Sequence, residues 1–223
     1  MKYKNNSIQV SCDGGAATGK STGAKMISKK FNLKFLSSGL LYRYASYLLL
    51  RYKPKKEITF LKKKFQKLDY RKLDKLYLHS PEITEFSAII AKKNYIRSIL
   101  KKFQINFSKK NKNCCIEGRD ISTKILPNSD LKFYFKCNLD IAAKRRYLEL
   151  KKKRYKITFN EVRKSLKMRD SSDKKRKHSP LLKHTDALEI DTGKLGISAM
   201  VRKMSAAVNE GIKKKYGSRI KTR

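Results

Sequence analysis

Short apolar runs alternate with longer amphipathic stretches along most of this chain. The stretches repeat apolar residues every three or four positions, which is typical of helices packed on one face. Three of the short runs are nearly all apolar, as parallel strands buried on both faces are. The pattern therefore predicts an α/β fold, a five-stranded parallel sheet with helices on both faces. The predicted strands occupy residues 7–12, 33–37, 113–118, 131–137 and 186–192.

The first predicted helix, over residues 20–31, joins the first two strands into a βαβ unit. Three apolar side chains of this helix are available to face the core: Ala24, Met26 and Ile27. Further helices are predicted over residues 39–52, 140–153, 158–175 and 195–212.

Two helix starts carry capping signals. Ser80 can cap a helix whose first turn holds Pro81, which predicts a helical segment over residues 80–100. Thr158 and Glu161 have the spacing of a capping box.

The chain of 223 residues is long enough for one well-filled domain, and its charge is extreme. It holds 57 Lys and Arg against 18 Asp and Glu, a formal net charge of +39. Such a field attracts polyanions, but Lys supplies 43 of the 57 positive residues, as in proteins with AT-rich codon usage. No single block carries the charge, so the charge alone decides little.

Cysteine and histidine residues show no metal-binding or redox spacing. The four cysteines form no CxxC pair, which favours buried thiols in a reducing compartment: Cys12, Cys114, Cys115 and Cys137. No apolar run approaches the roughly 18 residues of a membrane span. We therefore expect a soluble, cytoplasmic protein without a membrane partner.

Residues 14–21 spell G-x-x-x-x-G-K-S between a predicted strand and a predicted helix. In this context the pattern is the phosphate-binding loop of P-loop NTPases, and a glycine-rich turn that binds nothing is the weaker alternative. Small residues let backbone N–H groups wrap a phosphate, and the helix dipole points at the same anion. Lys20 would reach the β- and γ-phosphates, and Ser21 would hold Mg²⁺ carried by ATP. The predicted ATP-binding residues are Gly14, Gly15, Ala16, Ala17, Thr18, Gly19, Lys20, Ser21 and Thr22.

Five segments together resemble, in order and spacing, the signature segments of bacterial-type cytidylate kinases. The resemblance covers most of the chain except roughly residues 52–80 and the C-terminal tail. It implies a P-loop nucleoside monophosphate kinase that transfers phosphate from ATP to CMP, and to dCMP as well, in pyrimidine nucleotide metabolism. The segments are "DGGAATGKST" (13–22), "SSGLLYR" (37–43), "EGRDISTKILPNSDLKFYF" (117–135), "MRDSSDKKRKHSPL" (168–181) and "DALEIDT" (186–192).

The arginines agree with this resemblance, because a nucleoside monophosphate is a dianion that guanidinium groups grip bidentately. The resemblance implies catalytic roles for Lys20, Arg119 and Arg43, and a role for Asp13 in supporting Mg²⁺ through water. It implies acceptor binding by Ser38, Arg43, Arg97, Arg119, Asp120, Arg169, Asp173 and Arg176. Asp120 and Arg97 would read the cytosine edge, and Arg145 and Arg146 would bind the triphosphate.

The resemblance also implies the organisation of a single kinase domain. The core would comprise residues 1–43, 108–150 and 181–216, with a basic tail at 213–223. An acceptor-binding insertion would span about 44–107, and a mobile lid about 151–180. Residues 52–80 contain no glycine where the family commonly has a small β-meander, so we expect a helical insertion.

Individual positions also depart from the family pattern, among them Ala17 where the family often has glycine and Ala88 where it has a serine near the base. Gly15 stands where the family usually has proline, and Glu117 replaces an aspartate. Ser122 replaces a glycine, and Ser172 replaces an arginine of the lid.

Three alternatives remain open to experiment. A monophosphate kinase for UMP or AMP would share these motifs. A nucleic-acid-binding P-loop ATPase would need an aromatic stacking platform or a switch segment, and the sequence indicates neither. A purely structural basic protein would leave the phosphate-binding loop unexplained. We expect a monomer without a stable nucleic acid partner.

Overall fold

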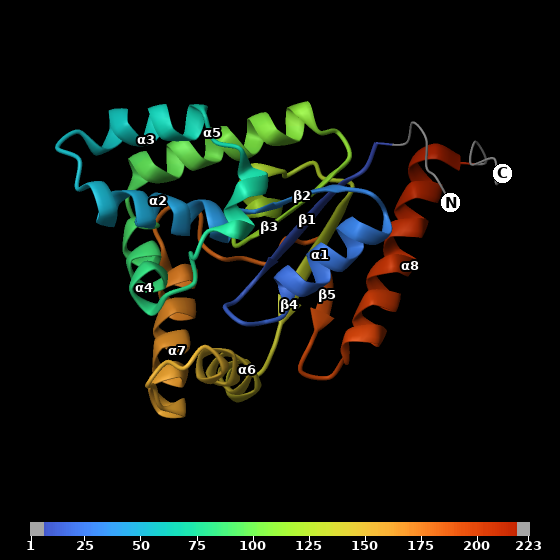
Figure 1. Cartoon of the computed structure of the whole chain (residues 1–223). Helices are drawn as coiled ribbons and strands as arrows, with labels where there is room; N and C mark the ends of the chain where they lie inside the picture. Colours follow the sequence, from blue (N-terminus) through green and yellow to red (C-terminus); the bar gives the residue numbers. More distant parts are fainter. Residues whose placement is uncertain (1–6, 218–223) are drawn as a thin grey trace. The chain divides into compact units, whose positions relative to one another are not determined.

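The computed structural model describes residues 7–217, and within them five strands form one sheet in the order β2-β3-β1-β4-β5 (Figure 1). β1 lies at the centre and pairs in parallel with β3 and β4, and β4 pairs in parallel with β5. The predicted fold class is thus confirmed. The strands are β1 (Gln9–Gly14), β2 (Lys34–Ser37), β3 (Cys114–Gly118), β4 (Leu131–Lys136) and β5 (Leu188–Asp191).

The helices fall where the periodicity predicts them, with one exception. The segment 80–100 is two helices rather than one, because the chain turns at Ala91 and Lys93 takes an extended conformation at the start of the second helix. The helices are α1 (Lys20–Lys30), α2 (Ser38–Tyr52), α3 (Glu57–Gln66), α4 (Pro81–Ile90), α5 (Asn94–Lys110), α6 (Leu139–Lys152), α7 (Phe159–Lys175) and α8 (Ile197–Tyr216). Two short helical turns are η1 (Tyr70–Lys75) and η2 (Ile121–Ile125).

Both predicted caps are present. The Ser80 hydroxyl accepts a hydrogen bond from the Ile83 amide at the start of α4, and Pro81 occupies the first turn. At α7, Thr158 accepts from the Glu161 amide, while the Glu161 carboxylate accepts from the Thr158 amide. This reciprocal pair satisfies N–H groups that would otherwise lack partners at the helix start.

The described chain divides into two compact units, residues 7–35 with 112–217, and residues 36–111. Apart from the last two residues of β2, the regular elements of the second unit are helices, and the unit packs its own core. Phe65 of α3 meets Phe103 of α5 edge to face, with ring centroids 5.8 Å apart. Tyr70 of η1 meets Phe107 in the same way at 4.9 Å. The regular structure of the glycine-free stretch 53–80 is helical, as predicted, and consists of α3 and η1.

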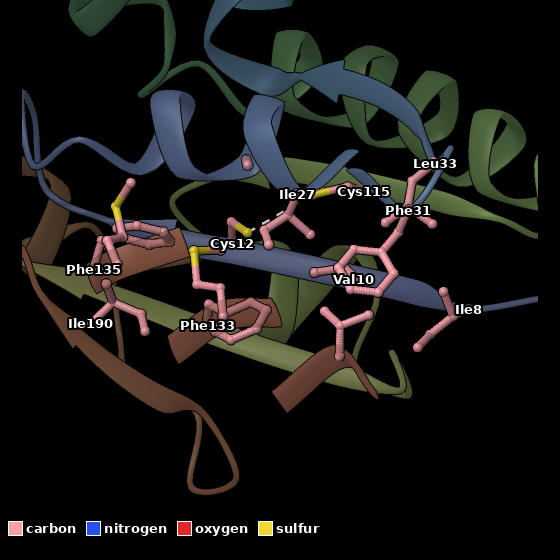
Figure 2. Packing of buried hydrophobic residues seen from close by; sticks show 14 of the residues in the cluster. Ile8, Val10, Cys12, Ile27, Phe31, Leu33, Cys115, Phe133, Phe135 and Ile190 are labelled. Carbon is pink, nitrogen blue, oxygen red and sulfur yellow. Dashed lines mark hydrogen bonds between the residues drawn. The ribbon is translucent and has the colours of Figure 1, made fainter. Parts of the chain in front are cut away.

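The core of the first unit lies between the sheet and helices α1 and α8 (Figure 2). Val10 and Cys12 of β1 pack there with Phe133 and Phe135 of β4. Ala24 and Ile27 of α1 are completely buried, as predicted, whereas Met26 is 40% exposed. The prediction for Met26 was wrong because its direction on α1 lies outside the face that carries Gly23, Ala24 and Ile27.

The four cysteines are free thiols. Cys12, Cys114 and Cys115 are buried, as predicted, and Cys137 is half-buried. The Cys12 and Cys115 sulfur atoms lie 3.9 Å apart on neighbouring strands. Burial raises the pKa of the Cys12 thiol well above its usual value, which keeps it protonated and unreactive. Within residues 7–217, no helix combines the length and apolar content that crossing a membrane requires.

Candidate active site

The loop between β1 and α1 has the backbone that its sequence predicts. Gly14 has φ 154°, and a Cβ atom there would lie 2.4 Å from the Phe135 carbonyl oxygen, so only glycine fits. Gly19 has φ 78° and directly precedes α1, and Ala17 also has positive φ, at 55°. No side chain caps the start of α1, and the first N–H groups of a helix have no intrahelical partners, which is the usual arrangement of an anion site.

Lys20, the first residue of α1, is buried and paired with an acidic residue of β3. Its Nζ lies 3.4 Å from Glu117 Oε2 and donates to the Gly15 carbonyl at 3.5 Å. Burial, followed by the positive charge of Arg119, lowers the pKa of Lys20 to about 8, and Glu117 opposes this shift. The loop lysine is thus held by a carboxylate that the sequence analysis did not assign to the site.

Asp13, the residue before the loop, is completely buried and holds the start of η2. Its carboxylate accepts hydrogen bonds at 2.7 Å from the backbone amides of Ile121 and Ser122, and a third from the Ser122 hydroxyl. Burial raises the pKa of Asp13 to about 6, although these hydrogen bonds favour the ionised form. Asp13 therefore joins the end of β1 to the segment after β3, and its contact with Mg²⁺ stays a prediction.

Replacing Asp13 by asparagine is expected to lower the free energy of unfolding by about 1–3 kcal/mol at pH 7, because the new amide group would face the Ser122 N–H as a second donor. In the wild type the folded protein holds the Asp13 proton more tightly than the unfolded chain does. The wild-type stability should therefore fall as the pH rises from about 4 to about 6, and D13N should lack this component.

Chemical denaturation between pH 4 and pH 7 measures both effects. Asp74→Asn, at an exposed position, is the matched control. Equal stability of D13N and D74N at pH 7 would contradict the linking role of Asp13.

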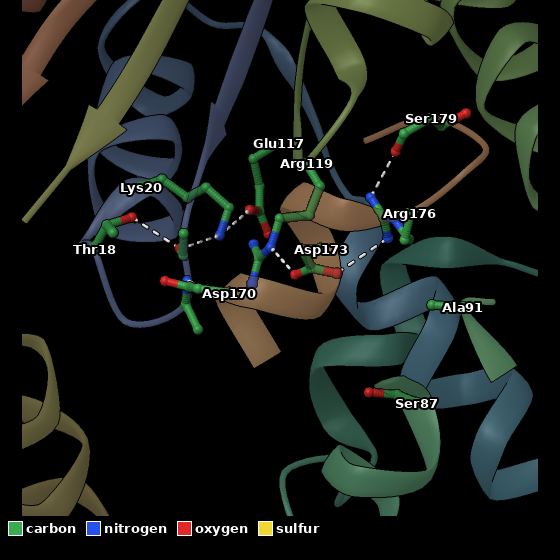
Figure 3. A network of polar contacts seen from close by, with 12 residues as sticks. Thr18, Lys20, Ser87, Ala91, Glu117, Arg119, Asp170, Asp173, Arg176 and Ser179 are labelled. Atoms are coloured by element: carbon green, nitrogen blue, oxygen red, sulfur yellow. Dashed lines mark hydrogen bonds and ion pairs between the residues drawn. The ribbon is translucent and has the colours of Figure 1, made fainter. Parts of the chain in front are cut away.

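Three charged residues form a network around the buried Asp173, beside the loop (Figure 3). Arg119 Nε donates to Asp173 Oδ2 at 2.8 Å, and Arg176 Nη1 lies 3.1 Å from Asp173 Oδ1. Burial opposes ionisation of Asp173, but Arg119, Arg176 and Arg169 outweigh it and hold the pKa of Asp173 below its usual value. Arg176 Nη2 also donates to the Ser179 carbonyl at 2.8 Å. The network ties the residues after β3 to α7.

A second carboxylate of α7 reaches the phosphate-binding loop itself. The Ala16 amide donates to Asp170 Oδ1 at 2.8 Å. Ala16 also packs in an apolar cluster with Val162 and Leu166 of the same helix. Asp170 lies 154 positions from Ala16 along the chain, and no role was predicted for it.

The two predicted triphosphate arginines on α6 have protein partners. Arg145 donates to the Thr192 hydroxyl at 3.0 Å and to the Thr192 carbonyl at 2.7 Å. The Thr192 hydroxyl in turn donates to the Thr18 carbonyl at 2.8 Å, so Arg145 supports the loop through Thr192. Arg146 pairs with Glu149 on its own helix at 2.8 Å. Contact of either arginine with a triphosphate stays a prediction.

The structure thus brings several of the predicted residues of the first unit into one charged cluster. Arg119 and Arg169 act electrostatically on Lys20, and both also act on Asp173. Glu117 and Asp170 complete this cluster, and both were missed. Two sequence signals could have found Glu117: its place in the segment 117–135 that resembles the family, and its place at the end of the third predicted strand, where parallel strands collect site residues.

Three predicted acceptor residues, Ser38, Arg43 and Arg97, belong to the second unit. Ser38 is the buried first residue of α2, and the preceding Ser37 caps this helix by accepting from the Leu40 amide. Arg97 of α5 is only 9% exposed, donates to the Ala91 carbonyl at 3.3 Å and lies over the Tyr42 ring. Their role in binding an acceptor stays a prediction.

Comparisons with known proteins cover almost the whole chain. The family described as cytidylate kinase matches residues 10–210. A cytidylate kinase of Bartonella tribocorum is 38% identical over 195 residues, which is 85% of this chain and 89% of that protein. A cytidylate kinase of Fusobacterium nucleatum is 36% identical over 218 residues, 92% of this chain and 99% of that protein.

Solved structures share the fold at much lower identity. An uncharacterized protein from Eubacterium ventriosum aligns with a TM-score of 0.55 at 13% identity, over 91% of this chain and 98% of its own. Shikimate kinase from Bacteroides thetaiotaomicron aligns with a TM-score of 0.50 at 11% identity, over the same shares of the two chains. These likenesses concern the fold alone.

Proposed function

The chain belongs to the cytidylate kinase family, and on that premise we propose that it transfers the γ-phosphoryl group of ATP to CMP, giving ADP and CDP. We extend the proposal to dCMP as a second acceptor. The observation that carries it is the loop after β1, where a buried Lys20 stands at the start of α1 beside Glu117. Such a loop binds a nucleotide phosphate, and the family match supplies the acceptor.

The proposed reaction is a direct in-line transfer. An oxygen of the CMP phosphate attacks the γ-phosphorus, the bond to the β–γ bridging oxygen breaks, and that oxygen leaves with ADP. The loop amides hold the β-phosphate, while Lys20 and Arg119 neutralise the charge that spreads over the transferred group. The protein forms no covalent bond with the transferred group. It accelerates the reaction by positioning the two nucleotides and by neutralising the charge on the transferred phosphoryl group.

Magnesium would enter with the nucleotide and neutralise phosphate charge. The oxygen donors present suit this hard cation: Ser21 is exposed in the first turn of α1, and the Glu117 carboxylate lies beside Lys20. Asp13 fits less well, because its carboxylate already accepts three hydrogen bonds from residues of η2. We therefore propose Ser21 and Glu117 as the side chains that face the ion.

For the acceptor, we propose that Arg119 and Arg43 grip the CMP phosphate and that Ser38 contacts the same nucleotide. Asp120 and Arg97 would read the cytosine edge, and Arg169, Asp173 and Arg176 would bind ribose and phosphate. The Arg119–Asp173–Arg176 network supports this proposal, because it keeps two guanidinium groups fixed and charged beside the loop. A lid at about 151–180, a monomeric state and a cytoplasmic location remain further predictions.

The rate should fall at high pH because Lys20 loses its charge. Its pKa of about 8 means that Lys20 is charged below this pH and neutral above it. We expect kcat/KM for ATP to be constant near pH 7 and to fall about tenfold per pH unit above about pH 8.5. Initial rates at saturating CMP and low ATP measure the profile.

Lys20→Arg is the control for this profile, because a guanidinium stays charged over the whole range. Its residual activity should lack the alkaline decline. A wild-type profile that stays flat to about pH 9.5 would contradict the assignment.

The proposed function is tested by measuring ADP formation with four acceptors, CMP, dCMP, UMP and AMP, in a coupled assay. We expect CMP and dCMP to give the highest kcat/KM. A higher kcat/KM for UMP or AMP would contradict CMP as the acceptor. ADP formation that RNA stimulates in the absence of any monophosphate would contradict the kinase reaction and favour a nucleic-acid-dependent ATPase.

A further inference from the structure

The Asp170 carboxylate accepts a hydrogen bond from a backbone amide of the phosphate-binding loop. Its Oδ1 atom accepts from the Ala16 amide at 2.8 Å, a distance typical of a charge-assisted hydrogen bond. Under the proposed function this amide belongs to the set that wraps a nucleotide phosphate. A single N–H group makes one strong hydrogen bond, so the carboxylate and a phosphate oxygen exclude each other there.

Gly15 is what lets the carboxylate come so close. A Cβ atom on residue 15 would lie 2.5 Å from Asp170 Oδ2, which is a clash, and 3.2 Å from Asp170 Cγ, which is a tight contact. Residue 15 is also a position where this chain departs from the proline usual in the family. The contact between α7 and the loop therefore depends on a feature of this particular chain.

The rest of α7 holds Asp170 in place. The capping box of Thr158 and Glu161 fixes the start of the helix, and Val162 and Leu166 are buried in the cluster that includes Ala16. Asp173, one turn further on, is held between Arg119 and Arg176. Asp170 thus projects from a helix that is anchored before and after it.

Asp170 carries a negative charge at a place where a nucleotide phosphate would also bring negative charge. Lys20, Arg119 and Arg169 gather around the loop, and Asp170 acts electrostatically on Arg119. A carboxylate in this field gains from the same positive charges that would attract a nucleotide phosphate. Both anions therefore compete for the field as well as for the Ala16 amide.

We propose that Asp170 determines the affinity for the donor nucleotide, because its carboxylate must release the Ala16 amide before a nucleotide phosphate binds there. The inference rests on the proposed function, since it takes this loop as the ATP site. Asp170 weakens ATP and ADP binding in the wild type, and Gly15 is the residue that makes this competition possible.

The test is the dissociation constant of ADP, measured by isothermal titration calorimetry without CMP. Asp170→Asn keeps the shape but removes the charge, and Asp170→Ala removes the acceptor altogether. We expect D170N to bind ADP about tenfold more tightly and D170A at least as tightly as D170N. Adenosine, which lacks phosphates, should show no gain in either variant.

Gly15→Ala is a second way to free the Ala16 amide from Asp170, because the added methyl group would push away the end of the flexible Asp170 side chain. G15A alone should also tighten ADP binding, and it should add nothing in the D170A background. Asp186→Asn, an exposed change elsewhere in the same unit, is the matched control and should leave ADP binding unchanged.

An unchanged or weaker affinity of folded D170N and D170A for ADP would overturn the proposal. An equal effect of G15A with and without Asp170 would overturn the role given to Gly15. These two outcomes can be told apart from failure of the proposed function. ADP binding is measured without an acceptor, whereas the proposed function is tested by phosphoryl transfer to CMP.

Discussion

We expect the replacement of Lys20 by alanine to lower kcat for CMP phosphorylation by about a thousandfold. Removing one preorganised charge that stabilises a transition state typically costs a hundred- to a thousandfold in kcat. Lys20 belongs at the upper end of this range because it is only 8% exposed, so water does not replace the missing charge. Initial rates at saturating ATP and CMP measure the loss.

Lys29→Ala is the matched control, because Lys29 lies exposed on the same helix. It should keep wild-type activity. Lys20→Ala also leaves Glu117 buried without its ion-pair partner, so circular dichroism and thermal unfolding must show that the variant is folded. K20A/E117Q removes this buried charge and should restore stability but not activity.

Undiminished transfer in folded K20A would remove the active site proposed for this loop. Restored activity in K20A/E117Q would instead mean that Lys20 serves only to neutralise Glu117. Because Glu117 is itself proposed to face Mg²⁺, E117Q alone is measured as the reference. A loss of kcat in K20A/E117Q beyond the loss in E117Q belongs to Lys20 as a catalytic residue, whereas equal activity of the two variants would make Lys20 a structural one.

Replacing Phe135 by alanine is expected to cost about 3–5 kcal/mol of unfolding free energy, the usual range for a buried phenylalanine. Phe135 is 1% exposed and lies in β4, next to the central strand β1 and opposite Gly14 in the register of the two strands. Its ring contacts α1 so closely that a Cβ atom on Gly23 would lie 2.9 Å from it. The cavity would therefore open beneath α1 at Gly23, just after the phosphate-binding segment.

Chemical denaturation measures this loss, and the melting temperature should fall by roughly 6–20 °C. Leu148→Ala on α6 removes an apolar side chain that is 55% exposed and should cost well under 1 kcal/mol. A loss from F135A as small as that from L148A would contradict the packing described for the core. Addition of saturating ADP should stabilise F135A less than the wild type, because the loop above the cavity is less well held.

Local signals in the sequence were sufficient for most of the fold. Helical spacing and capping residues act over one or two turns, so α4 and α7 could be located from Ser80 and from Thr158 with Glu161. The glycines of the phosphate-binding loop are also a local signal, because Gly14 and Gly19 adopt positive φ angles that favour glycine. The loop, its lysine and the class of fold were therefore predictable.

What the sequence could not indicate is which distant side chains meet this loop. Glu117 and Asp170 lie about 100 and 150 positions beyond it, and no periodic pattern marks either one. The order of the strands brings Glu117 to Lys20, and the packing of α7 on Ala16 brings Asp170 to the loop amide.

Burial is decided in the same way. Met26 is exposed and Asp13 is buried, against simple hydropathy, because the faces of α1 and η2 that meet the sheet were set by neighbours far along the chain. The sequence by itself determined the local conformations and the chemistry of the loop, since these depend on near neighbours. Only the tertiary structure decided the carboxylates that surround the loop, because their positions depend on contacts between segments that are remote in sequence.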